Sequence, residues 1–124
     1  MNDYEHTAFT LPTIDIVGGE TESLTFNIYT STHEPADLVS GTECGFAIAP
    51  YVAQNATPLI TKTCTIQAGS SGANNVVITS LSSSDTVNLY GKYIYQLTIK
   101  FGNRAEPYQG IMYIARNIHL GYLA

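Results

Sequence analysis

Three histidines are the first residues to consider for metal binding or acid–base catalysis. His6, His33 and His119 lie in separate terminal or loop regions, and no short metal-ligand spacing relates them. A metal site would need the fold to gather them beside a carboxylate such as Glu34 or Asp37. We therefore expect exposed histidines, no metal site and no bound cofactor.

Hydrolytic chemistry would need paired carboxylates or an activated serine. Glu20 and Glu22 alternate before a strand and so share one face. A glycosidase, however, holds two carboxylates across a cleft with aromatic walls, and the chain has no Trp. The serines at 80 and 82–84 lack a Gly-x-Ser-x-Gly elbow, and Gly18-Gly19 lacks the helix and lysine of a phosphate-binding loop. We expect no catalytic residue and no enzyme activity.

Cys44 and Cys64 could form one disulfide or remain two thiols. The segment 44–64 is typical of a hairpin, and pairing Ile48 with Ile60 places the two cysteines opposite each other with both side chains inward. Free cysteine is among the most buried residue types, and a chain of this size needs no disulfide to fold. The reduced pair is favoured, and the disulfide is the alternative.

Nine tyrosines are the most unusual feature of the composition. Tyr93 and Tyr95 belong to the apolar face of a strand, and we expect the Tyr93 hydroxyl to bond to nearby backbone. The candidates for exposure are Tyr29, Tyr51, Tyr113 and Tyr122. Tyrosine is enriched in protein interfaces and is also favoured in strands. An interface role and ordinary strand propensity therefore explain these four tyrosines equally well.

The segment 108–115 carries apolar groups on both faces. Ile111 and Tyr113 lie on one face, and Met112 and Ile114 lie on the other. A bare edge strand of this kind would be a pairing hazard, so we expect one face to be covered by the C-terminal tail or by another subunit. The expected interface residues are Tyr29, Tyr51, Ile111, Tyr113 and Tyr122.

Short strands separated by turns must position these side chains. The run 88–100 alternates from Tyr93 onward, with apolar residues on one face and polar residues on the other, interrupted only by Ile94. Similar runs predict seven strands, at 13–17, 23–30, 43–49, 59–67, 75–80, 88–100 and 108–115. A single helical turn is expected within 82–89 and a turn at 102–107. The chain is therefore expected to be one all-β sandwich domain spanning residues 1–124.

Charge and hydropathy exclude several classes of partner. The formal net charge is −5 and no basic cluster occurs, so nucleic-acid binding has no electrostatic support. No stretch approaches about 18 consecutive apolar residues, so no membrane insertion is expected. The first residues have neither the basic region nor the apolar core of a signal peptide, which favours a cytoplasmic chain.

Four segments share a common order and spacing with a known family, namely Gly19–Ile28, Ala36–Thr42, Asp85–Leu97 and Tyr108–Gly110. Together they resemble the immunoglobulin-like domains of phage and prophage tail structural proteins, among which is the N-terminal domain of the baseplate upper protein. The similarity covers about residues 12–117. The resemblance implies an immunoglobulin-like β-sandwich of about seven antiparallel strands in two sheets. It also implies that Tyr95 stands where an antibody domain has a cysteine, which removes the inter-sheet disulfide.

The resemblance further implies a function. Such a domain would be a non-enzymatic structural module of a phage or prophage tail or baseplate, found in the virion or in the cytoplasm. It would contact other tail or baseplate subunits or further copies of itself. The alternative is a cell-surface or secreted binding module, such as an adhesin or a carbohydrate-binding β-sandwich.

Overall fold

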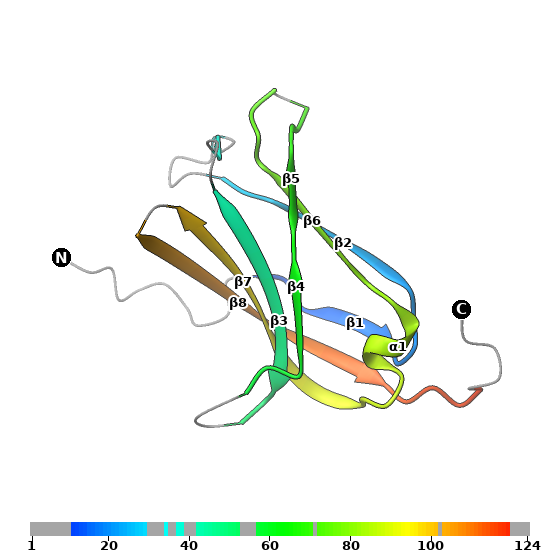
Figure 1. Cartoon of the computed structure of the whole chain (residues 1–124). Coiled ribbons are helices and arrows are strands. Elements are labelled where there is room, and N and C mark those ends of the chain that lie inside the picture. The colour runs from blue at the N-terminus through cyan, green and yellow to red at the C-terminus, as the bar shows by residue number, and fades with distance from the viewer. Residues whose placement is uncertain are drawn as a thin grey trace.

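The computed structural model describes residues 11–29, 34, 37–38, 42–52, 57–70, 72–101 and 103–119, which form a two-layer β-sandwich (Figure 1). The strands are β1 (Ile14–Val17), β2 (Glu22–Asn27), β3 (Glu43–Pro50), β4 (Ile60–Thr63), β5 (Thr65–Gln67), β6 (Val76–Leu81), β7 (Gly91–Phe101) and β8 (Arg104–Ala115). One short helix, α1 (Ser83–Thr86), precedes β7. No helix among the described residues is long and apolar enough to cross a membrane. The expected all-β sandwich is confirmed.

The two layers differ in size. Sheet A has five strands in the order β1-β8-β7-β3-β4, and sheet B has three in the order β2-β6-β5. All neighbouring strands are antiparallel except β1, which runs parallel to β8 with Ile14 opposite Met112. The expectation of antiparallel strands throughout is therefore wrong at this pair. A parallel pair needs a long crossover connection, and here the rest of the domain provides it.

The predicted strand 59–67 is in fact two strands that belong to different sheets. β4 pairs with β3, with Ile60 opposite Ile48, whereas β5 pairs with β6. Cys64 is the one residue between them, and its N–H donates to the carbonyl of Cys44 at 2.9 Å. The described residues therefore contain eight strands rather than seven, because one alternating run leaves one sheet and joins the other.

The core lies between the inward faces of the two sheets. Alternate residues of β7 are buried, namely Tyr93, Tyr95, Leu97 and Ile99. The Tyr95 ring packs against Phe26 of β2 and Phe46 of β3, at centroid distances of 6.0 Å and 5.8 Å. Gly110 of β8 faces the same ring, and a Cβ at this position would lie only 2.6 Å from a ring carbon. A glycine is therefore required where β8 passes Tyr95.

Helix α1 begins with a capping box. The N–H of Ser82, the N-cap residue, donates to Asp85 Oδ2 at 2.7 Å, and the same oxygen lies 2.9 Å from Lys62 Nζ of β4. The ion pair thus joins α1 to sheet A. The expectation of a helical turn within 82–89 is confirmed.

The hairpin between β7 and β8 is tighter than the sequence predicts. β7 ends at Phe101 and β8 begins at Arg104, so the expected turn at 102–107 is wrong beyond residue 103. Pro107 lies within β8 opposite Thr98. The proline is tolerated because β1 pairs only with Met112–Ala115 on the other side of β8, and none of the described residues pairs with residue 107 on that side.

Candidate protein interface

The outer surface of sheet A is set by the same alternation that builds the core. The outward residues of neighbouring strands form cross-strand rows, since each lies beside its register partner. One row contains Asp15 of β1, Tyr113 of β8, Lys92 of β7 and Tyr51, the residue after β3. The next row contains Ile111, Ile94 and Ala49. These two rows and the outward residues beside them on the same strands are named the sheet A face.

The centre of the sheet A face is apolar and shallowly hollowed. Three consecutive outward residues of β3 are small, namely Gly45, Ala47 and Ala49. A shallow pocket of about 170 Å³ is lined by Ala47, Ala49, Pro58, Ile94, Gln96 and Gln109. Gln109 Nε2 donates to Gln96 Oε1 at 2.9 Å, and Gln96 Nε2 donates to Thr98 Oγ1 at 2.8 Å. These polar groups bond to one another, which lowers the cost of removing the face from water.

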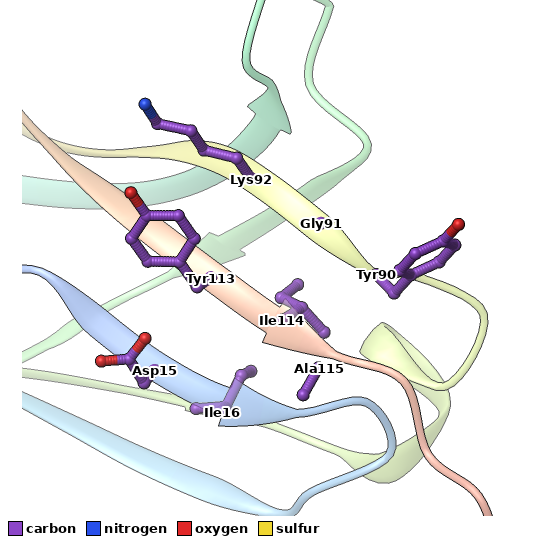
Figure 2. A pocket seen from close by; sticks show the side chains of 8 residues that line it. All are labelled: Asp15, Ile16, Tyr90, Gly91, Lys92, Tyr113, Ile114 and Ala115. Carbon is purple, nitrogen blue, oxygen red and sulfur yellow. The ribbon is translucent and has the colours of Figure 1, made fainter.

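Aromatic rings occupy one end of the sheet A face. Tyr51, Tyr113 and Tyr90 have exposed fractions of 45%, 43% and 61%. Lys92 Nζ lies 4.1 Å from the centroid of the Tyr51 ring, and Arg116 Cζ lies 4.4 Å from that of Tyr90. A second shallow pocket, of about 450 Å³, has Tyr90, Lys92 and Tyr113 in its lining. Figure 2 shows Tyr113 between Asp15 on the neighbouring β1 and Lys92 on β7.

The outer surface of sheet B is polar along its two flanking strands, and the half-buried Val76 and Ile78 of the central β6 lie between them. Its exposed outward residues on β2 and β5 are polar, namely Ser23, Thr25, Asn27, Thr65 and Gln67. Polar strand surfaces of this kind suit contact with water. An apolar patch with aromatic residues at its edge is typical of a protein interface instead. The sheet A face is therefore the candidate functional site.

The structure brings three of the five predicted interface residues together. Tyr51, Ile111 and Tyr113 all lie on the sheet A face. Tyr29 is 56% exposed but follows β2 in sheet B, so it lies outside the face. Tyr122 lies outside the described residues. Sequence reasoning missed the contributions of Asp15, Lys92 and the small residues of β3, although Ile94 signalled that the polar side of β7 was interrupted.

The other residues with possible chemistry are dispersed. His119 is exposed, and His6 and His33 lie outside the described residues. Within the described ranges, no group of three or more His, Cys, Asp or Glu residues could hold a metal ion. Glu20 accepts a hydrogen bond from the N–H of Val17 at 3.3 Å, and a hydrogen bond with Glu20 raises the pKa of Glu22. Glu20 thus belongs to the turn after β1, and Glu22 begins β2.

The two cysteines lie opposite each other as expected, both buried and both thiols in this structure. Burial, with a smaller contribution from Cys64, raises the pKa of Cys44 to about 11. Burial also raises the pKa of Cys64. A thiol with a raised pKa is a poor nucleophile, which indicates a packing role for this pair. The Tyr93 hydroxyl donates to the carbonyl of Tyr90 at 3.2 Å, which confirms the expected bond to nearby backbone.

Comparison with known proteins identifies no family. No family model matches the chain, and no curated protein matches it. Arguments about class and function therefore start from the strand order and from the sheet A face.

Proposed function

We propose that this chain is an immunoglobulin-like domain that acts as a non-enzymatic structural module of a phage or prophage tail or baseplate. The observation that carries the proposal is the sheet A face, an apolar sheet surface with aromatic residues at one end and internally bonded glutamines. Such a surface works by contacting another protein. The outward charged residues of its strands, Asp15, Glu43, Lys92 and Lys100, are not grouped as acid–base catalysis would require.

The strand order supports the immunoglobulin-like class. In these domains strands B, E and D share one sheet, and strands C, F and G share the other. The order β2-β6-β5 fits B-E-D, and the order β8-β7-β3 fits G-F-C. The Tyr93 hydroxyl bond to Tyr90 is of the kind found in a tyrosine corner. The contact between Phe26 and Tyr95 joins the two sheets where an antibody domain has its disulfide.

The absence of a disulfide requirement supports assembly inside a cell. Phe26, Phe46 and Tyr95 pack together across the two sheets, so aromatic contact replaces a covalent link. A domain held this way folds in a reducing cytoplasm, where tail proteins are made and assembled. The resemblance of segments 19–28, 36–42, 85–97 and 108–110 to tail-protein domains supplies the particular setting.

The proposal is tested on phage particles induced from the strain that encodes the chain. The chain should copurify with the particles, and gold-labelled antibody should mark their tails in electron micrographs. Replacing the gene with one encoding Ile94→Glu should remove the chain from the particles, because a carboxylate cannot be buried unpaired at an apolar contact. Particles that contain no copy of the wild-type chain would overturn the proposal.

The matched control is Ile78→Glu. Ile78 is half-buried and points outward from β6 in sheet B, as Ile94 does from β7 in sheet A. The two substitutions therefore impose a similar cost on the isolated domain. Only Ile94→Glu alters the sheet A face, so the control should enter the particles normally.

One observation favours the alternative of a glycan-binding module. The pocket of about 450 Å³ carries an exposed tyrosine, Tyr113, between a carboxylate and an ammonium group, a combination that could stack on and hydrogen-bond to a sugar. A glycan array would decide between the two functions. Binding that is lost in Tyr113→Ala would favour the alternative, and an array without signal would favour the tail module.

A further inference from the structure

We propose that the occupant of the sheet A face is a second copy of this chain, bound through the same face in a twofold dimer in which Asp15 of each copy pairs with Lys92 of the other. This inference rests on the proposed function, because it takes the sheet A face to be an assembly surface. It adds the identity of the partner and the geometry of the contact.

The two charges lie symmetrically about Tyr113. Asp15 on β1 and Lys92 on β7 are both register partners of Tyr113 on β8, which lies between them. Adjacent strands are about 4.8 Å apart, so the backbones of Asp15 and Lys92 are separated by about 10 Å. Within the described part of the chain, neither residue forms an ion pair. Each copy thus presents two opposite charges on the strands that flank one exposed tyrosine, and the Lys92 ammonium group lies over the neutral ring of Tyr51.

A twofold axis running along β8 would pair these charges. Rotation about an axis that lies in the interface exchanges the two sides of β8, so the position of Asp15 in one copy faces that of Lys92 in the other. The exchange happens twice in a symmetric dimer. The same operation sets Val17, which is 42% exposed, opposite Tyr90 at 61%, and sets Ile111 against its own counterpart. Across the proposed interface, opposite charges therefore face each other and apolar side chains face apolar or aromatic ones.

The overall charge of the chain also favours this face for self-association. The chain carries a net charge of −5, so two copies repel each other at most orientations. The outward charged residues of the sheet A strands are Asp15, Glu43, Lys92 and Lys100, which cancel. Two copies can approach through this face without like-charge repulsion.

The size of the contact fits a weak dimer. With the axis along β8, the strands that face the partner are β1, β8 and β7, and the residues beside β1 extend from 11 to 17. Strands spaced about 4.8 Å apart and rising about 3.4 Å per residue give roughly 350 Å² for three strands over seven residues. Two copies together would bury roughly 700 Å², which is in the range of weak, transient contacts. We therefore expect a dimer whose population depends strongly on protein concentration.

Charge reversal tests the geometry directly. Sedimentation of the wild-type chain should show a species of twice the 13.4 kDa monomer mass as concentration rises. Asp15→Lys alone and Lys92→Asp alone should each weaken self-association at least about tenfold, because each places like charges opposite each other twice. An equimolar mixture of the two variants should form a heterodimer, since both contacts become attractive again. The double variant Asp15→Lys/Lys92→Asp should form a homodimer for the same reason.

The controls change charge equally but away from the central row. Glu43→Lys and Lys100→Asp alter an outward pair at the far end of β3 and β7, where the rotated copy places no residue of β1. Both variants should dimerise as the wild type does. The four substituted positions all carry exposed side chains, so circular dichroism should show an unchanged fold.

Three results would overturn the inference. The first is a wild-type chain that stays monomeric at its highest soluble concentration. The second is self-association that survives in both single variants, and the third is a mixture that fails to form the heterodimer. A monomeric chain that still enters phage particles, and does so less in Ile94→Glu, would leave the proposed function standing with a different partner. Failure of the particle experiment alone would instead remove the proposed function and leave the dimer.

Discussion

At the scale of single residues, Tyr95 shows how a polar side chain can serve an apolar core. Its ring is buried between Phe26 and Phe46, and its hydroxyl donates to the carbonyl of Pro12. Burial raises the pKa of Tyr95 to about 12, so the hydroxyl remains a donor at neutral pH. The side chain therefore connects the core to the segment that enters β1.

Replacing Tyr95 by Phe should lower the free energy of unfolding by about 1 kcal/mol, because the Pro12 carbonyl loses its donor while the ring packing is kept. Urea unfolding measures the change. The control is Tyr113→Phe, whose exposed hydroxyl should contribute less than about 0.5 kcal/mol. Equal stability of Tyr95→Phe and the wild type would show that the bond to Pro12 adds nothing.

A second prediction concerns the glycine that faces Tyr95. Gly110→Ala should destabilise the domain by about 2 kcal/mol or more, because its Cβ would lie 2.6 Å from the buried ring. Gly45→Ala is the matched control, since the nearest atom to a Cβ there is 3.9 Å away on the outer face of the same sheet. Thermal unfolding of the two variants should separate them clearly. A Gly110→Ala protein as stable as Gly45→Ala would mean that the Tyr95 ring moves aside at little cost.

At the scale of elements, Asp85 joins α1 to sheet A and also caps the helix. Burial by itself would raise its pKa, but hydrogen bonds from Lys62 and Ser82 outweigh burial and lower it. A carboxyl group with a lowered pKa in the folded state stabilises the fold above its unfolded pKa, and this contribution is lost as the pH falls. The connection between β6 and β7 should therefore loosen in acid.

Asp85→Ala should cost about 1 to 2 kcal/mol at pH 7, because it removes both the cap and the ion pair. Lys62→Ala removes only the ion pair and should cost less than about 1 kcal/mol. Denaturant unfolding at pH 7 and below pH 3.8 checks both values. The difference between Asp85→Ala and the wild type should shrink at the lower pH, and a constant difference would argue against the role of the carboxylate charge.

The sequence predicts best those strands in which apolar and polar residues alternate. The alternation along β7 and β2 identifies which residues are buried, and both strands lie within about two or three residues of their expected bounds. The separation of β4 from β5 is not visible, because the alternation through 59–67 is the same whichever sheet the residues join. Pairing of β1 with β8 involves strands almost a hundred residues apart, and no local pattern specifies it.

Pro107 shows why a turn signal failed. The carbonyls of Gln109 and Ala115 accept hydrogen bonds from Leu11 and Gly18, so odd-numbered residues of β8 direct their backbone groups toward the side of β1. At Pro107 this side lies beyond the short β1, and among the described residues no strand bond there requires the missing N–H. Whether a proline fits at position 107 therefore depends on the length of β1, which cannot be read from the residues around Pro107.

The candidate site was predictable only in part for a similar reason. Exposed tyrosines and the two-sided apolar last strand pointed to Tyr51, Ile111 and Tyr113. The row that joins Asp15 to Lys92 depends on the register of three strands, two of which are parallel. Register of this kind is decided by the assembled sheet, so charges far apart in the sequence could not be paired beforehand.

At the scale of the whole molecule, the layer between the sheets holds groups that must stay protonated. Burial raises the pKa of Cys44 from 9.0 to about 11 and that of Tyr95 from 10.0 to about 12. The unfolded chain ionises first as the pH rises, so the stability tied to these protons is fully present below pH 9 and is lost as the pH rises through 11 and 12. The whole sandwich should therefore weaken in alkali.

Urea unfolding between pH 8 and pH 11, in the presence of a reducing agent, measures this effect, and the midpoint should fall with rising pH. The variant Cys44→Ala/Tyr95→Phe, compared with itself at pH 8, should show a smaller fall. The comparison isolates the two groups from other lysine and tyrosine ionisations. An identical fall in the variant and the wild type would show that these protons do not govern alkaline stability.

The parallel pairing of β1 with β8 has a mechanical consequence. The chain enters β1 at Ile14 and leaves β8 at Ala115, which are at opposite ends of the shared ladder. Tension applied at these two points would slide the strands lengthwise past each other and load all of their hydrogen bonds at once. An antiparallel pair under the same tension would open one bond at a time. A domain closed in this way should withstand stretching between residues 14 and 115 better than its equilibrium stability would indicate.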